Sequence, residues 1–248
     1  MILNEPPRTQ YDLNFRVLSI PVRVHPLFWL AAVLLGVCGN EQPQRLMLWV
    51  AAVFVSILVH ELGHALAARF CGWDPRITLH VFGGLASYQP TYRSPIKQIL
   101  ITLAGPGAGF LFAGLIAVSI AASGHRLVFG WPDFVLPVVF APYASNPLNW
   151  LLLDLLYVNI FWGLVNLLPI YPLDGGQVSQ EVFQLINPRD GLRQSLWLSI
   201  VVAAGAGILA YVRMQEIFLL LFFGYMAYMS YTTLQGYFGP GGGLGGYR

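Results

Sequence analysis

The residues best suited to chemistry in this sequence are two histidines and a glutamate inside one apolar run. His60, Glu61 and His64 occur in the segment HELGH, and residues 46–71 around them are otherwise largely apolar. Histidines at positions i and i+4 of a helix lie on one face, so both imidazoles can bind one metal ion. Glu61 lies on an adjacent face, where it can act as a general base. This H-E-x-x-H arrangement is typical of zinc hydrolases.

Two histidines do not complete a catalytic zinc site, which usually has three protein ligands and one open position. The further candidate ligands are His25, His80, His125, Asp154 and Asp174. Asp174 stands out because it occurs in NLLPIYPLDGG, where two prolines prevent a regular helix and two glycines permit a sharp turn. We therefore expect Asp174 to reach the depth of HELGH. His80 could instead be a ligand or orient a neighbouring group.

The elements that position these residues are predicted to be membrane-spanning helices. Of the 248 residues, 56% are hydrophobic and 10% are charged, whereas a soluble domain has about 25% charged residues. A net charge of +2 excludes a large basic surface for nucleic acid, and two cysteines exclude a disulfide framework. We predict an all-α polytopic membrane protein with about six spans. The predicted spans are residues 26–39, 46–71, 98–122, 150–168, 195–212 and 216–232.

Short membrane-associated strands are expected beside these helices. Residues 15–24 are predicted to form a strand at the membrane surface, and residues 77–82 and 85–89 to form two strands around Gly83 and Gly84. The tail is rich in glycine and is expected to be flexible. The predicted organisation has three parts: a cytoplasmic or interfacial segment (1–24), an integral-membrane domain (25–232) and the Gly-rich tail (233–248).

The distribution of Lys and Arg predicts the orientation in the membrane. If the N-terminus is cytoplasmic, the far side holds only Arg45, Arg126 and Arg213 of the 13 Lys and Arg residues. Cytoplasmic loops carry an excess of these residues. We therefore expect a multi-pass protein of the cell (inner) membrane with both termini cytoplasmic. Residues 123–149 then form the longest far-side loop, which either caps the helices or dips into the membrane.

HELGH in one span, with NLLPIYPLDGG at the end of a later one, resembles the site-2 protease family of intramembrane zinc metalloproteases. IPVRVHPLFWL, FGGLASY and LAGPGAG are similar to further segments of this family, so the resemblance covers roughly residues 20–180. It implies that His60, His64 and Asp174 bind one zinc ion and that Glu61 is the general base. It also implies an endopeptidase that cuts peptide bonds within or near transmembrane segments of membrane-anchored proteins.

Residues that bind the substrate are expected near these ligands. Asn166 could hydrogen-bond the substrate backbone or the developing oxyanion, or make an ordinary interhelical hydrogen bond. Gly83, Gly84 and Leu85 could offer an exposed strand edge to an extended substrate, or form a simple surface hairpin. The expected partners are membrane-spanning protein substrates and the lipid bilayer, with no nucleic acid. The sequence predicts no oligomeric state.

Two other functions are alternatives to the protease. A divalent-metal transporter would carry ligands on several spans along a through-path, whereas the ligands here converge from two segments and the sequence has no second histidine cluster. A catalytically silent membrane scaffold would normally lack Glu61 or a ligand, and this chain lacks neither. The protease is therefore the favoured interpretation.

Overall fold

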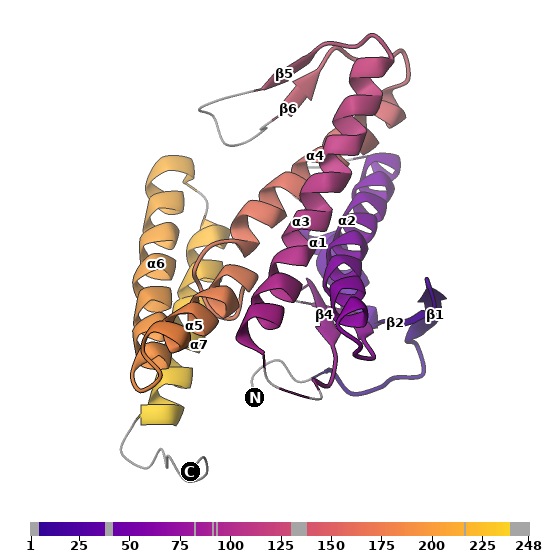
Figure 1. Ribbon diagram of the computed structural model, residues 1–248. Helices are drawn as coiled ribbons and strands as arrows, with labels where there is room; N and C mark the ends of the chain where they lie inside the picture. Colours follow the sequence, from indigo (N-terminus) through magenta and orange to yellow (C-terminus); the bar gives the residue numbers. More distant parts are fainter. Residues whose placement is uncertain are drawn as a thin grey trace. The chain divides into compact units, whose positions relative to one another are not determined.

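The computed structural model describes residues 5–37, 42–81, 83–90, 92, 94–129, 138–215 and 217–238. The described residues form mainly helices, together with a four-stranded and a two-stranded sheet (Figure 1). This arrangement confirms the predicted fold class.

Five helices within the described ranges are long and apolar enough to cross a membrane. They are α2 (Pro43–Phe70), α3 (Pro95–Ala122), α4 (Asn146–Asn166), α6 (Gly191–Met214) and α7 (Ile217–Phe238). The remaining predicted span, residues 26–39, contains a shorter apolar helix, α1 (Pro26–Val37). The 12 residues of α1 extend about 18 Å, less than the roughly 30 Å of a hydrocarbon core. Residues 38 and 39 lie outside the described residues.

The chain divides into two compact units. Unit 1 comprises Met1–Arg93 and Ala104–Leu164, and unit 2 comprises Ser94–Leu103 and Val165–Arg248. HELGH therefore belongs to unit 1, whereas Asp174 belongs to unit 2.

Unit 1 contains a four-stranded sheet with the order β1–β2–β3–β4. Its strands are β1 (Leu13–Val17), β2 (Ile20–Val24), β3 (Arg76–His80) and β4 (Gly83–Ser87). Strands β2 and β3 are parallel, and the other two pairs are antiparallel. Residues 15–24 thus belong to a hairpin rather than to the single strand predicted. The reason is that Leu18 and Ser19 adopt the positive φ angles, 49° and 68°, of a tight two-residue turn.

The second predicted hairpin is shifted along the sequence. Strands β3 and β4 pair with His80 opposite Gly83, so Gly83 and Gly84 belong to β4 rather than to the turn. The strand predicted at residues 85–89 therefore begins earlier than expected. Strand β4 is the last in the sheet, so one of its edges pairs with no other described strand.

The sheet lies at one end of α2 (Figure 1). Alternate residues of a strand point to opposite faces, and Val22, Val24, Ile77 and Leu79 on one face are buried in a cluster with Ile57 of α2. Strands β2 and β3 are parallel neighbours that flank α1 and α2 in the sequence. Helix α1 must therefore lead away from the sheet and α2 must return to it. The start of α1 and the HELGH end of α2 consequently lie at the same end of unit 1.

The opposite end of unit 1 carries a short hairpin of β5 (Leu127–Phe129) and β6 (Val138–Phe140), beyond the ends of α3 and α4 (Figure 1). Phe140 packs on a cluster that includes Ile120 of α3 and Leu156 of α4. The long loop predicted between these two helices thus contains a hairpin that covers their ends.

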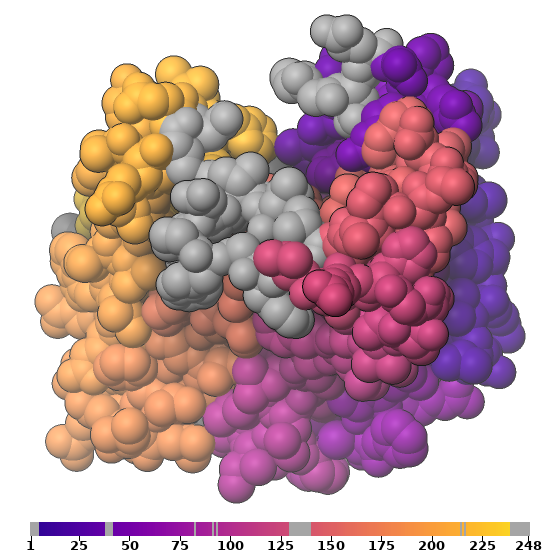
Figure 2. Space-filling model, turned by 90° about the horizontal axis from the view of Figure 1, so that it is seen from above, coloured from indigo at the N-terminus to yellow at the C-terminus, as the bar shows by residue number. Residues whose placement is uncertain are grey.

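Unit 2 is built on α5 (Asp174–Ile186), α6 and α7. Helices α6 and α7 pack side by side, and their orange-to-yellow atoms form one continuous surface in the space-filling view (Figure 2). Ile170, in the segment before α5, is buried in a cluster with Ala203 of α6 and Phe223 of α7. Helix α7 extends beyond the end predicted for the last span, and residues 239–248 of the predicted tail lie outside the described residues.

Candidate functional site

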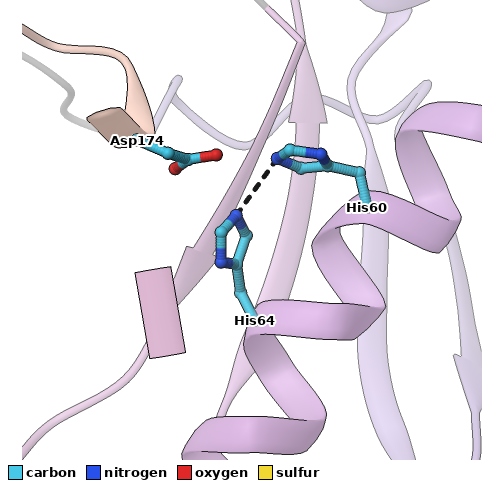
Figure 3. Close-up of side chains that lie close together, drawn as sticks. All are labelled: His60, His64 and Asp174. Carbon is cyan, nitrogen blue, oxygen red and sulfur yellow. Dashed lines mark hydrogen bonds between the residues drawn. The ribbon is translucent and has the colours of Figure 1, made fainter. Parts of the chain in front are cut away.

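His60 and His64 form a buried pair on α2. Only 4% of His60 and 7% of His64 is exposed. Their Nε2 atoms lie 3.1 Å apart, and the ring centroids are 4.8 Å apart (Figure 3). Two nitrogens bound to one tetrahedral zinc ion at 2.0–2.1 Å lie about 3.3 Å from each other. The histidine pair therefore fits zinc as two of its ligands, since both nitrogens face one point.

Glu61 is buried beside strand β4, with 5% of the residue exposed. A Cβ atom added at Gly84 would overlap the Glu61 side chain and lie 2.5 Å from its Oε1 atom. Glycine at this position lets the backbone of β4 pass directly over the carboxylate. The structure thus brings together Glu61 and the predicted substrate-binding strand. A Cβ atom added at Gly83 would instead lie 3.2 Å from the Trp162 ring, and its φ of +114° favours glycine.

Helix α3 approaches the histidine pair through its glycines. A Cβ atom at Gly105 would overlap the His64 ring, lying 2.7 Å from its Cδ2 atom. Gly63 of α2 allows the same close approach from the other helix, because a Cβ atom there would lie 2.7 Å from the Cβ of Ala108. The segment LAGPGAG therefore packs closely against the helix that carries HELGH. Gly109 faces a different helix, because a Cβ atom added there would lie 3.5 Å from Oδ1 of Asn159 in α4.

Asp174 is the first residue of α5, and 8% of it is exposed. The two glycines that follow it allow a close approach of backbone to backbone. A Cβ atom at Gly175 would lie 2.5 Å from the carbonyl oxygen of Leu168, and one at Gly176 would lie 2.5 Å from that of Ile170. The carboxylate is placed at the helix N-terminus, where the backbone dipole favours a negative charge. Figure 3 shows Asp174 extending from this first turn.

The segment that leads into Asp174 is held by two buried serines of unit 2. The backbone N–H of Tyr171 donates a hydrogen bond to Ser199 Oγ of α6 at 3.1 Å, and Ser230 Oγ of α7 donates to the Tyr171 carbonyl at 3.0 Å. Both serines are fully buried. The last two long helices thus position the aspartate loop. These serines were not among the predicted site residues, although small polar residues within apolar spans often make such interhelical contacts.

The other candidate ligands have structural partners. The backbone N–H of Leu27 donates to His25 Nδ1 at 3.2 Å at the start of α1, and His125 stacks on Tyr143 with ring centroids 3.7 Å apart. Asp154 forms an ion pair with Arg45, which joins α4 to the start of α2.

His80 is buried in β3, and its pKa is lowered by burial and then by the charges of His25 and Arg23. The lowered pKa favours a neutral imidazole. Asn166 is the last residue of α4 and is buried. Its predicted role toward the substrate stays a prediction.

Comparison with known proteins identifies the family of this chain. The family model described as peptidase family M50 matches residues 48–209. The chain belongs to peptidase family M50. This confirms the resemblance to the site-2 protease family that the HELGH and NLLPIYPLDGG segments indicate.

Several relatives of this M50 member have names that refer to zinc. The chain is 31% identical over 160 residues to a putative zinc metalloprotease from Synechocystis, an alignment that covers 64% of this chain and 36% of the relative. It is 26% identical over 172 residues to a zinc metalloprotease from Methanocaldococcus jannaschii, covering 68% and 44%. The chain thus spans less than half the length of either relative.

A solved structure shares the fold of this M50 member. The site-2 protease from Methanocaldococcus jannaschii superposes with a TM-score of 0.57 at 21% identity. The match covers 90% of this chain and 95% of that one. The likeness therefore extends over nearly the whole fold.

Proposed function

We propose that this protein is an intramembrane zinc endopeptidase that hydrolyses peptide bonds within or near transmembrane segments of membrane-anchored proteins. The observation that carries the proposal is the buried His60–His64 pair, with Glu61 beside it, in a helix long and apolar enough to span a membrane. Ionisable groups in such a helix are expensive and default to a functional role.

The cofactor in this proposal is one zinc ion bound by His60, His64 and Asp174. These three buried residues, all within the described part of the chain, form a group of side chains that could hold a metal ion (Figure 3). Two imidazoles and one carboxylate match the donor sets of catalytic zinc sites. With Zn²⁺ bound, two neutral imidazoles and one carboxylate would leave a net positive charge on the site, which favours attack on a carbonyl group.

Zinc, when bound, polarises the peptide carbonyl and stabilises negative charge on its oxygen. Glu61 then supplies the acid–base chemistry: its carboxylate removes a proton from the attacking water and returns it to the leaving amine. Asn166 donates a hydrogen bond to the substrate backbone or to the developing oxyanion. Burial of Glu61 and of both histidines keeps these groups in fixed positions, so little reorganisation is needed during the reaction.

The substrate in this proposal binds as an extended segment along β4. A transmembrane helix has every backbone amide paired internally, so it must unwind locally before a peptide bond can be cut. The edge of β4 that pairs with no other described strand, at Gly83, Gly84 and Leu85, offers backbone partners to the unwound segment. Gly84 contacts Glu61, so a segment on this edge lies next to the proposed general base.

The proposed location is the cell (inner) membrane, with both termini and the sheet on the cytoplasmic side. Arg23 precedes α1 and Arg76 follows α2, and the pairing of β2 with β3 keeps these two ends together. Cytoplasmic positions are rich in such residues. Labelling of a cysteine introduced at His125 from outside the cell tests this orientation, and labelling from the cytoplasm alone would contradict it.

The function is tested by co-expressing the chain with tagged single-span membrane proteins. We expect fragments cut within or near the span, and no fragments with Glu61→Gln, which should retain its zinc. Asp74→Asn is the matched control, because Asp74 is an exposed carboxylate between α2 and β3. Fragments formed equally well by Glu61→Gln would remove Glu61 from the mechanism. Uptake of zinc into vesicles without any cleavage would favour a transporter.

A further inference from the structure

The polar face of the four-stranded sheet borders a cavity that the proposed protease chemistry does not use. The cavity has a volume of about 320 Å³ and lies in unit 1. Its charged lining residues are Glu5, Arg8, Arg16, Arg23 and Arg76, and Asn14 and Thr78 are its uncharged polar ones. The opposite, apolar face of the sheet packs on α2, so this cavity is separate from the histidine pair.

The strand register places two arginines on either side of a proline. Arg16 of β1 lies opposite Pro21 of β2. Val22 lies opposite Ile77 in the parallel pair, so the same register sets Pro21 beside Arg76 of β3. Strands are 4.7–4.9 Å apart, and the two arginine Cα atoms are therefore about 10 Å apart. The compact ring of Pro21 leaves room above it, and the side chains of Arg16 and Arg76 are long enough for their guanidinium groups to reach an anion bound there.

Arg23, in the next row of the sheet, already has partners. Its Nη1 atom lies 3.3 Å from Asp12 Oδ2, and its Nη2 atom donates to the carbonyl oxygen of Pro6 at 2.8 Å and lies 3.9 Å from Glu5. Glu5 also accepts a hydrogen bond from Ser87 Oγ at 3.0 Å. These contacts tie the N-terminal segment to the polar face of the sheet and shape the wall of the cavity.

The other three arginines of the cavity keep an unbalanced positive charge. Arg8, Arg16 and Arg76 are exposed, and none of them forms an ion pair within the ranges that the structure describes. Among the described residues, Glu5 is the one carboxylate that lines the same cavity. Like charges gathered around one hollow repel each other, and a bound anion would relieve that repulsion.

We infer that this cavity binds a phosphate-bearing anion between Arg16 and Arg76, with Arg8 as a third contact. The planar guanidinium group matches a phosphate with two parallel hydrogen bonds. The volume lies at the small end of ligand pockets and suits a phosphate with a small polar group. Two sources have this chemistry: the headgroup of an anionic phospholipid in the adjoining membrane, and a soluble phosphate ester.

The test is binding to the purified full-length protein in detergent. Native mass spectrometry measures retention of dioleoyl phosphatidic acid, phosphatidylglycerol and phosphatidylcholine, and calorimetry measures glycerol 3-phosphate. We expect an anionic lipid or glycerol 3-phosphate to bind and phosphatidylcholine not to bind. Retention of lipid alone assigns the site to a headgroup, whereas comparable binding of glycerol 3-phosphate assigns it to a soluble ester. Failure of every phosphate ligand to bind overturns the inference.

Variants separate a built site from diffuse attraction. Arg16→Gln with Arg76→Gln should weaken binding at least about tenfold. Arg16→Lys with Arg76→Lys should also weaken it several-fold, because lysine keeps the charge but loses the paired donors. Arg189→Gln with Arg193→Gln removes two exposed arginines outside the cavity and should change nothing. Equal losses in the control, or full binding by the lysine variant, would overturn the inference.

A gain of binding keeps the test independent of folding defects. Glu5→Gln removes the carboxylate from the cavity and retains an oxygen that can accept from Ser87. We expect this variant to bind the phosphate ligand about threefold more tightly. Unchanged or weaker binding, with an unchanged melting temperature, would show that no anion lies near Glu5.

Discussion

The histidine pair and the aspartate loop are positioned by different means. On α2, helical spacing alone sets His60 and His64 on one face, and glycines of β4 and α3 make room around Glu61 and His64. The loop before Asp174 has no such periodicity, and buried serines of two later helices hold its backbone. A proposed ligand within a regular helix is thus positioned locally, whereas a proposed ligand that follows an irregular loop depends on distant residues.

The largest expected effect is loss of the metal when a proposed ligand is removed, either from the histidine pair or from the start of α5. His64→Ala and Asp174→Ala should each lower zinc affinity more than about 100-fold, since even the outer partners of metal ligands contribute roughly 10–100-fold. Zinc content by elemental analysis and substrate cleavage measure the result. Full metal content and turnover in Asp174→Ala would contradict the proposed role of Asp174, because another residue would then be the third ligand.

The next effect distinguishes two glycines of one helix. Gly105→Ala should push a methyl group into the His64 ring and lower zinc affinity at least about tenfold. Gly107→Ala is the matched control, because no atom outside its own stretch of helix lies within 4 Å of a Cβ there. It should leave activity unchanged. Equal behaviour of the two variants in zinc titrations would show that the close approach of α3 is not required.

The serines that hold the aspartate loop should have a moderate effect. Ser199→Ala and Ser230→Ala each remove the buried hydrogen bond to Tyr171, together with one to the serine's own helix, and should lower the free energy of unfolding by at least about 1 kcal/mol. A looser loop should also reduce turnover roughly 3- to 10-fold with zinc still bound. Ser119→Ala, which removes an exposed hydroxyl that bonds within α3, serves as the control. Turnover that is unchanged in both loop variants would contradict a positioning role for the serines.

The smallest expected effect is on the pH dependence of the stability of the β1–β2 hairpin. Hydrogen bonds from Thr9 and the charge of Arg23 hold the pKa of Asp12 below its usual value. This contribution to stability is present above the ordinary aspartate pKa, about 3.9, and is lost as pH falls through the lowered pKa. The hydrogen-exchange protection factors of β1 and β2, corrected for the intrinsic exchange rate at each pH, should therefore fall in acid. Asp12→Asn should abolish this pH dependence, and an unaltered pH profile would exclude Asp12 as its source.

The parts of the molecule predicted well from sequence follow local rules. The long helices and the pairing of His60 with His64 depend on apolar length and on helical spacing. Gly83 and Gly84 were misplaced because glycine usually marks a turn. In the structure, the glycine at position 84 is required by contact with Glu61, a residue distant in sequence.

Other features depend on contacts that no local pattern encodes. Helix α5 was not predicted, because two prolines precede it and two glycines occupy its first turn, and these residues concealed its start. The bonds from Ser199 and Ser230 to Tyr171 join three separate segments. The close fit of Gly105 against His64 depends on how α3 crosses α2. Such contacts become visible only when the fold is known.

The parallel pairing of β2 with β3 has a consequence for biosynthesis. Strand β2 leaves the ribosome before α1, and β3 follows only after α2. The β1–β2 hairpin therefore waits with an open edge while the two intervening helices enter the bilayer. The sheet can close only if α2 has returned to the side on which α1 began, so its completion depends on correct insertion of the helix that carries HELGH.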